Sequence, residues 1–288
     1  MITERDLATP IENTWCPGCG NFGILAALKR AIIESVEELR VPLESFVIVT
    51  GIGCHGKLAN YINLNSFHTI HGRVLPIATG IKMANPDLIV IGHAGDGDAY
   101  AIGIAHLIHA AKRNVPVVYI VHNNFRFSLT TGQVTPTTRK GEKTRTTPFG
   151  NPEEPLNPLA LSIASGATFV ARGFSGDIPH LTWLIKEAIK HDGFALIDVI
   201  QPCIAWDPEH DYKYWRERIY KLEEHGHNPT DINEAYKKAY EINGKIPIGI
   251  FYRVKKPTII DSFPQYSRFK PIKVTTRKNI KNLLEEFR

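Results

Sequence analysis

The stretch from Gly95 to Asn124 constrains the fold more than any other part of this chain. An apolar run leads into a Gly-Asp-Gly turn at Asp96, an apolar helical segment follows, and a second apolar run ends at Asn124. This order of strand, glycine turn, helix and strand is the repeating unit of a parallel sheet. Because the carboxyl ends of parallel strands meet at one edge, Asp96 and Asn124 are expected there together. Their oxygens are hard ligands for Mg²⁺, and the amides that open the helix suit a phosphate, so we predict a Mg²⁺-diphosphate site.

Strand-like and helical segments alternate along most of the chain, which predicts the α/β class. The predicted strands are 45–50, 87–94, 115–121, 168–171, 194–200 and 246–253. The predicted helices are 22–40, 76–84, 99–112, 158–164, 178–191, 211–225, 232–242 and 278–287, and Asn21 is expected to cap the first. We expect one α/β domain over 1–203, with a parallel sheet and helices on both faces, and a C-terminal extension over 204–288 that packs on the core or on a partner subunit. The long segment 125–157 has little apolar periodicity and is predicted to be a lid or partner-binding loop.

The bulk composition narrows the class of protein. The formal charge is +5, and much of the excess lies in the last forty residues, as expected of a solvated face or of a surface that docks an acidic partner protein. No basic repeat interleaved with aromatic residues indicates a nucleic-acid partner. The polar first ten residues show no secretory signal, and no apolar run reaches transmembrane length, so a cytoplasmic protein without a membrane partner is expected. The scarcity of Gln and Met is a compositional cue for a thermophile.

Four cysteines make metal or redox chemistry a candidate. They are Cys16, Cys19, Cys54 and Cys203. The Cys-Pro-Gly-Cys-Gly turn precedes a predicted helix, whose N-terminus favours a thiolate, and the other two cysteines follow predicted strands. Disulfides are disfavoured in a cytosolic chain, and a lone buried cysteine is usually a small apolar residue. The spacing fits a zinc site and a [4Fe-4S] cluster about equally well, and the neighbouring Mg²⁺-diphosphate site favours the cluster.

The aspartate and asparagine at the predicted sheet edge also have a purely structural interpretation. Asp96 can cap the following helix, and Asn124 can stabilise a turn. The pairing of both residues with successive strands favours the metal site, in which the main-chain carbonyl of Arg126 is a candidate third ligand.

Several motifs together resemble the β subunit of the 2-oxoacid:ferredoxin oxidoreductases. They are WCPGCG, GIGC, HGRVLPIATGIKMANPDL, GDGD, NN and TTGQVTPTT, and the resemblance extends from Trp15 to about Arg253. It implies a thiamine diphosphate-binding fold with an N-terminal cluster-binding segment. It implies that Cys16, Cys19, Cys54 and Cys203 ligate one [4Fe-4S] cluster. It implies that Asp96, Asn124 and the Arg126 carbonyl bind Mg²⁺, while Ile52, Gly53, Cys54, His55, His71, Gly97, Asp98, Ser128 and Leu129 line thiamine diphosphate.

The same resemblance implies an activity. It is the coenzyme A-dependent oxidative decarboxylation of 2-oxoacids to acyl-CoA and CO₂, with one-electron transfers through the cluster to ferredoxin. The motifs are nearer to the 2-oxoglutarate or broad-range branch than to the pyruvate branch. His55, Lys57 and Arg73, with His71, are candidates for a cationic lining that meets the substrate carboxylate, although Lys57 is equally well a solvated surface residue.

Activation of thiamine diphosphate needs a glutamate, which in this family comes from a separate α subunit. Nothing in the sequence marks a second domain for the cofactor's pyrimidine, so we expect activity only in an αβ assembly. Two alternatives remain at this stage. One is a non-redox thiamine diphosphate decarboxylase or synthase subunit. The other is a non-catalytic electron-transfer subunit.

Overall fold

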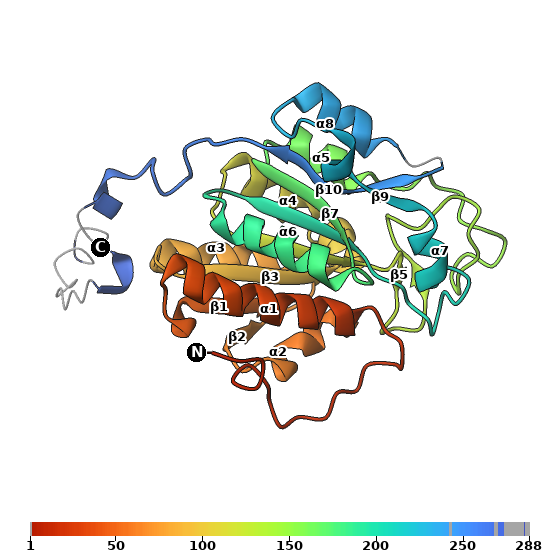
Figure 1. Ribbon diagram of the computed structural model, residues 1–288, viewed down its shortest axis with the longest axis horizontal. Coiled ribbons are helices and arrows are strands. Elements are labelled where there is room, and N and C mark those ends of the chain that lie inside the picture. Colours follow the sequence, from red (N-terminus) through yellow and green to blue (C-terminus); the bar gives the residue numbers. More distant parts are fainter. Residues whose placement is uncertain (1, 242–243, 268–269, 274–284, 286–288) are drawn as a thin grey trace.

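The computed structural model describes residues 2–241, 244–267, 270–273 and 285. The described residues form one large sheet with helices on both of its faces, and the described chain after residue 253 runs along the molecule to the helix Val74–Ala84, where the Tyr266 hydroxyl donates to the Met83 carbonyl (Figure 1). The predicted helix 278–287 lies, apart from Glu285, outside the described residues.

The sheet of the described chain has eight strands in the order β2-β1-β3-β4-β8-β7-β10-β9. The strands are β1 (Phe46–Thr50), β2 (Asn65–His68), β3 (Ile89–Gly95), β4 (Val118–Asn123), β7 (Phe169–Phe174), β8 (Ala195–Ile200), β9 (Ile219–Lys221) and β10 (Ile246–Arg253). Neighbouring strands are parallel except β10, which runs antiparallel to β7. The predicted α/β class with a mostly parallel sheet is therefore confirmed.

Helices cover both faces of this sheet. They are α1 (Asn21–Leu39), α2 (Leu58–Tyr61), α3 (Val74–Ala84), α4 (Ile104–Lys112), α5 (Pro158–Ala164), α6 (Ile178–Lys190), α7 (Tyr212–Arg216) and α8 (Ile232–Ala239). Helices α1, α2 and α6 contribute to one apolar cluster, and α3, α4, α5 and α8 contribute to the other. Within the described part of the chain, no helix has the length and apolar content needed to cross a membrane.

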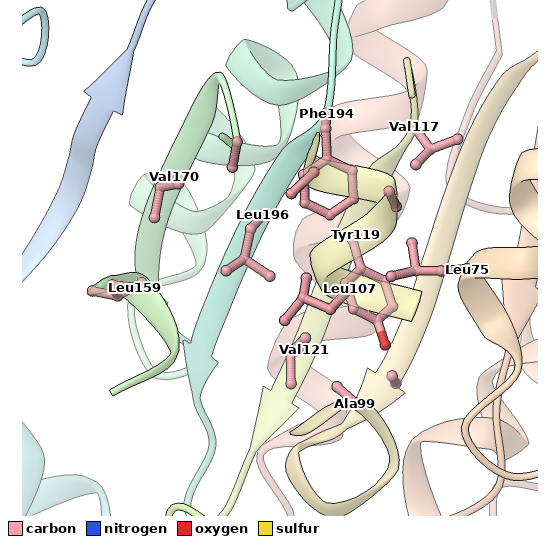
Figure 2. Packing of buried hydrophobic residues seen from close by; sticks show 14 of the residues in the cluster. Leu75, Ala99, Leu107, Val117, Tyr119, Val121, Leu159, Val170, Phe194 and Leu196 are labelled. Atoms are coloured by element: carbon pink, nitrogen blue, oxygen red, sulfur yellow. The ribbon is translucent and has the colours of Figure 1, made fainter. Parts of the chain in front are cut away.

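Strand β4 shows why the central strands are apolar at every position. Val118 and Ile120 pack into the cluster beneath α1 and α6, whereas Tyr119 and Val121 pack into the cluster beneath α3 and α4. Figure 2 shows Tyr119 and Val121 in the second cluster. Successive side chains of a strand point to opposite faces, and both faces are covered, so all of these positions are buried.

Two of the predicted helices differ from the structure. Asn21 does not cap α1 with its side chain, because its Oδ1 lies 2.7 Å from Nδ1 of His122 and is used there. The segment 211–225 is not one helix: α7 is followed by β9 and by a 3₁₀ turn at Leu222–His225. The sheet determines this outcome, since β9 pairs with β10 and withdraws these residues from a helix.

Three further features were not predicted. The helix expected at 99–112 is split into a π-helical turn (Gly97–Ile102) and α4. Strand β2 and the short helix α2 were missed, because the exposed side chains of β2 carry no apolar pattern. The segment 125–157 contains a small hairpin, β5 (Arg126–Phe127) with β6 (Gln133–Val134), and is otherwise irregular. Its function as a lid stays a prediction.

The packing of α4 generates a stability prediction. Leu107 is fully buried in the cluster shown in Figure 2, so Leu107→Ala should lower the free energy of unfolding by about 2–5 kcal/mol through lost contacts and a residual cavity. Urea denaturation followed by circular dichroism measures the change. The control Ile232→Ala removes a side chain that is 41% exposed and should cost less than Leu107→Ala. Equal costs would contradict this description of the core.

Candidate functional site

Four neighbouring parallel strands bring the predicted ligands to one edge of the sheet. Strands β1, β3, β4 and β8 stand side by side in that order. Cys54 follows β1, Asp96 follows β3, Asn124 follows β4, and Cys203 follows β8. Since all four residues lie beyond the carboxyl ends of their strands, they share the edge at which parallel α/β sheets bind ligands.

Asp96 is held in place by the 125–157 segment. Its Oδ2 accepts hydrogen bonds from the hydroxyl groups of Thr135, at 2.6 Å, and Thr137, at 2.8 Å. Its Oδ1 accepts none from another described side chain. Burial raises the pKa of Asp96 to about 6. A bound divalent cation would offset this cost of burying the carboxylate, so Asp96 fits the role of a Mg²⁺ ligand.

Asp98 organises two histidines beside Asp96. Its Oδ1 contacts Nδ1 of His71 and accepts a 2.6 Å hydrogen bond from the Gly72 amide, and its Oδ2 lies 3.4 Å from Nε2 of His55. Burial opposes ionisation of Asp98, but the contacts with His55, Gly72 and His71 outweigh it, and the pKa of Asp98 lies below its usual value. The carboxylate therefore lies between both imidazoles, and the Gly95 amide, which donates to Nε2 of His55 at 3.1 Å, fixes the second ring at the sheet edge.

Glycine is required where the chain turns into the π-helical segment. A Cβ atom on Gly97 would lie 2.1 Å from the ring of Phe127. Gly53, in the turn after β1, has φ of 149°, a conformation that L side chains rarely adopt. Both positions let backbone approach the edge more closely than a larger residue allows.

These residues surround a cavity of about 100 Å³, which we call the cofactor cavity. Every residue predicted to contact thiamine diphosphate or Mg²⁺ lines it: Ile52, Gly53, Cys54, His55, His71, Asp96, Gly97, Asp98, Asn124, Arg126, Ser128 and Leu129. Lys57 and Arg73, which were predicted to meet the substrate carboxylate, do not line this cavity. Lys57 donates from Nζ to the Thr14 hydroxyl at 3.0 Å, and Arg73 donates to the carbonyl of Gly72 at 3.3 Å.

All four cysteines line a second cavity of about 210 Å³, the cysteine cavity. The hydroxyl of Ser128 lies 3.2 Å from Sγ of Cys203, and burial raises the pKa of Cys19 to about 12. The cofactor cavity adjoins it, because Cys54, Asn124, Ser128, Leu129 and Gln201 line both. Lys57 also lines the cysteine cavity.

The sulfur atoms are not gathered as tightly as a single zinc ion requires. In a tetrahedral zinc site the ligand sulfurs lie about 3.8 Å apart, from Zn–S bonds of about 2.3 Å. Among the described residues, ligand atoms of Glu142, Asp207 and His210 lie within 4.8 Å of one another. No three cysteine sulfurs of the described chain lie that close together. The wider spacing fits a polynuclear cluster better than a single ion.

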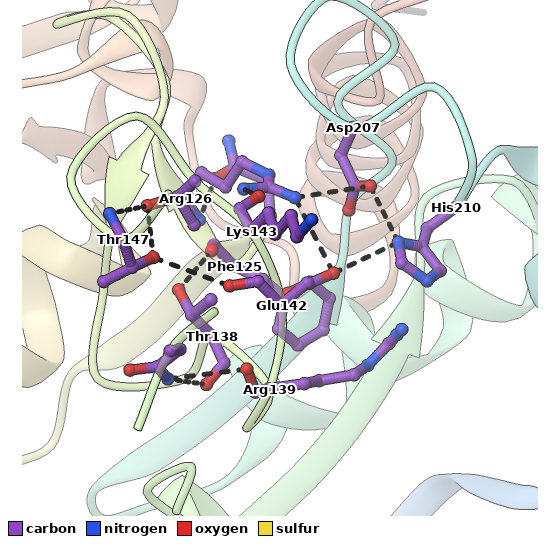
Figure 3. Close-up of polar contacts among 12 residues, drawn as sticks. Phe125, Arg126, Thr138, Arg139, Glu142, Lys143, Thr147, Asp207 and His210 are labelled. Carbon is purple, nitrogen blue, oxygen red and sulfur yellow. Dashed lines mark hydrogen bonds and ion pairs between the residues drawn. The ribbon is translucent and has the colours of Figure 1, made fainter. Parts of the chain in front are cut away.

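The Glu142, Asp207 and His210 set surrounds an arginine (Figure 3). The buried guanidinium of Arg126 lies 3.7 Å from Glu142 and 3.6 Å from Asp207, and it donates to the carbonyl of Lys143 at 3.2 Å. His210 lies 2.7 Å from Asp207. Because a cation already occupies the centre, this ion-pair cluster joins the 125–157 segment to the chain after Cys203 and is not a metal site.

Sequence reasoning missed several of these contacts. Thr135 and Thr137 belong to the TTGQVTPTT motif, but the motif alone did not indicate that their hydroxyls hold Asp96. Gln201, whose Nε2 lies 3.5 Å from Sγ of Cys19, directly follows β8, which was the available signal. Glu142, Asp207 and His210 lie far apart in the sequence and carry no shared pattern.

Comparison with known proteins first defines the class. Residues 51–199 match the family model described as thiamine pyrophosphate enzyme, C-terminal TPP binding domain. Residues 203–268 match the C-terminal model of the pyruvate ferredoxin oxidoreductase beta subunit. The chain thus contains the TPP-binding domain of a thiamine pyrophosphate enzyme.

Relatives define the family within that class. A 2-oxoacid:ferredoxin oxidoreductase subunit beta from Sulfolobus sp is 47% identical over 85% of this chain and 83% of its own length. A 2-oxoglutarate synthase subunit KorB from Methanocaldococcus jannaschii is 36% identical over 87% of this chain and 91% of its own. The solved 2-oxoglutarate:ferredoxin oxidoreductase from Magnetococcus marinus, with 2-oxoglutarate, coenzyme A and succinyl-CoA bound, matches with a TM-score of 0.88, 32% identity and coverage of 100% and 96%. This chain belongs to the β subunits of the 2-oxoacid:ferredoxin oxidoreductases, which are parts of an oxidoreductase complex.

The ion-pair cluster generates a stability prediction. Asp207→Ala should lower the free energy of unfolding by about 3 kcal/mol, because it leaves the buried Arg126 guanidinium poorly compensated. Chemical denaturation measures this change. Glu154→Ala removes the partner of Lys140 in an exposed ion pair and should cost at most about 1 kcal/mol. If the two substitutions cost the same, the cluster does not stabilise the loop.

Proposed function

We propose that this chain, bound to its α subunit, catalyses the coenzyme A-dependent oxidative decarboxylation of 2-oxoacids and passes electrons singly through a [4Fe-4S] cluster to ferredoxin. The observation that carries the proposal is the shared wall of the cofactor cavity and the cysteine cavity. A site for two-electron carbon chemistry beside a site for one-electron transfer is what such a reaction needs.

Bound thiamine diphosphate supplies a carbon nucleophile and an electron sink for decarboxylation. The residues of this chain are proposed to bind and orient it. Asp96, Asn124 and the Arg126 carbonyl would hold Mg²⁺, which would supply positive charge for the diphosphate. The free Oδ1 of Asp96 supports this assignment, and so does the close backbone approach at Gly97.

His55 and His71 are proposed to meet the carboxylate of the substrate. Their support is their common contact with Asp98 and their place in the lining of the cofactor cavity. His55 is almost fully buried, and His71 is partly exposed. The buried His55 suits the interior of the cavity, from which water is excluded, and the partly exposed His71 suits an entrance that admits a charged acid.

Cys16, Cys19, Cys54 and Cys203 are proposed as the cluster ligands. Cys203 is buried, Cys19 and Cys54 are half-buried, and Cys16 is exposed; burial raises the pKa values of Cys19, Cys54 and Cys203. Iron supplies the positive charge that such thiolates need. The wide spacing of the sulfurs supports a cluster over a zinc ion.

Three relations to other molecules follow from the family. The α subunit is proposed to supply the glutamate that activates the cofactor, ferredoxin to accept the electrons, and coenzyme A to accept the acyl group. The bound 2-oxoglutarate and coenzyme A of the Magnetococcus marinus structure support this substrate and acceptor. Neither alternative function accounts for both cavities. A non-redox thiamine enzyme does not require the cysteine cavity, and an electron-transfer subunit that binds no thiamine diphosphate does not require the cofactor cavity.

Activity is tested by producing the chain with its α subunit under anaerobic conditions and assaying a 2-oxoacid panel with coenzyme A and viologen. We expect viologen reduction that depends on coenzyme A and on a 2-oxoacid, and none from the isolated chain. Decarboxylation without viologen reduction would restore the non-redox alternative. Turnover by the isolated chain would exclude the role given to the α subunit.

The two proposed cofactor sites are separable by mutation. Asp96→Ala should abolish Mg²⁺-dependent binding of thiamine diphosphate, measured by calorimetry, while iron and sulfide content stays unchanged. Cys16→Ala, which changes a residue that lines the cysteine cavity and not the cofactor cavity, should remove iron and sulfide while thiamine diphosphate still binds. Zinc without sulfide in the parent protein would refute the cluster.

Lys57 provides a test of substrate range. Its proposed role is to meet the second carboxylate of 2-oxoglutarate from the wall of the cysteine cavity, which adjoins the cofactor cavity. Lys57→Ile should then raise KM for 2-oxoglutarate at least fivefold more than KM for pyruvate, since about 1 kcal/mol is a factor of five. Lys237→Ile, an exposed position on α8, is the matched control and should change neither. A common effect on both acids would leave Lys57 a structural residue that anchors Thr14.

A further inference from the structure

A third cavity, of about 290 Å³, lies at the carboxyl ends of β4, β7 and β8. None of its lining residues lines the cofactor cavity or the cysteine cavity. It is larger than either of those cavities, and no part of the proposed function uses it. Its chemistry is therefore a separate question from that of thiamine diphosphate.

The polar centre of this cavity is Arg172 of β7. Its side chain is only 9% exposed. Its nearest carboxylate is that of Asp198, on the neighbouring strand β8, with Nε 3.5 Å from Oδ2. Among the described residues, no acceptor lies within hydrogen-bonding distance of its two terminal amino groups, and they are not sealed inside the protein. Because Arg172 lines the cavity, these donors are available to a ligand there.

Asp198 fixes Arg172 but leaves its outer donors free. The Asp198 carboxylate accepts hydrogen bonds from the hydroxyl of Tyr100, at 2.8 Å, and from Nδ2 of Asn123, at 3.1 Å. These two hydrogen bonds fix the Asp198 carboxylate, and the carboxylate in turn fixes the Arg172 guanidinium through Nε. A fixed guanidinium with both terminal amino groups free matches the two oxygens of a carboxylate.

A second guanidinium borders the same cavity. Arg139 lies over the rings of Trp215, at 4.9 Å, and of Phe125, at 5.5 Å, and donates to the hydroxyl of Tyr214 at 3.3 Å. With Lys140, the lining carries three cationic side chains against two carboxylates, those of Glu154 and Asp198. The excess of one positive charge favours an anion.

The remaining wall is mostly apolar. It is formed by Phe125, Pro155, Leu156, Pro158, Ile200, Trp215 and Ile246. A pocket with a few fixed polar groups and an apolar wall is typical of sites for small organic molecules. We propose that this cavity binds a small free organic acid, with its carboxylate on Arg172 and an aliphatic or aromatic body against Ile200 and Ile246. The proposal does not depend on the function proposed above.

Calorimetry on the full chain in complex with its α subunit tests the proposal, with 4-methylpentanoate as the probe and its uncharged amide as the isosteric control. The acid should bind saturably, and the amide at least tenfold more weakly. Ile246→Trp fills the cavity and should weaken acid binding at least tenfold. Arg172→Lys keeps the charge beside Asp198 but removes the two-pronged donor, and should also weaken it about tenfold.

Two controls make the result decisive. Ile232→Trp, at an exposed position outside the cavity, should bind the acid like the parent protein. Both cavity variants should bind thiamine diphosphate like the parent protein, which excludes misfolding as the cause. The proposal is overturned if the parent binds no acid, if both cavity variants bind it unchanged, or if inorganic phosphate binds and the carboxylate does not.

Discussion

The contact between Asp96 and two threonines is the interaction on which the site depends. Asp96 ends the central strand β3, whereas Thr135 and Thr137 belong to the long segment after β4. Their hydroxyls bring that segment over the sheet edge, where it contributes Ser128 and Leu129 to both cavities. A carboxylate buried in this way costs free energy, and the two hydrogen bonds offset part of that cost.

The segment is anchored at two further points. Arg126 lies between Glu142 and Asp207, and the Ser128 hydroxyl contacts the sulfur of Cys203. Because Asp207 donates its own amide to the carbonyl of Cys203, the ion-pair cluster and the cysteine belong to one turn of chain. The cofactor cavity and the cysteine cavity are thus held against each other by the same loop, and a displacement of that loop alters both.

Much of the edge of the sheet was predictable from local pattern. Apolar runs followed by Asp96, Asn124 and Cys203 predicted three strand ends, and the parallel arrangement placed them together. The local pattern gave a wrong prediction at β9. The aromatic, charged segment 211–225 has a helical pattern, but part of it forms β9, which pairs with β10. The prediction that Asn21 caps α1 was also wrong, because its side chain contacts His122 of β4.

The sequence by itself determined the class of fold and predicted that Asp96, Asn124 and Cys203 meet at one edge of the sheet, because strand periodicity and turn glycines are local properties of the chain. The other residues predicted to contact the cofactor followed from the family resemblance. Only the tertiary structure decided which residues support that edge. Thr137 donates to Asp96, and Arg172 lies beside Asp198. Arg126 lies between Glu142 and Asp207. Each of these contacts joins segments that are distant in the chain. Such pairings depend on which buried charges must be compensated once the chain has packed, and no local pattern encodes them.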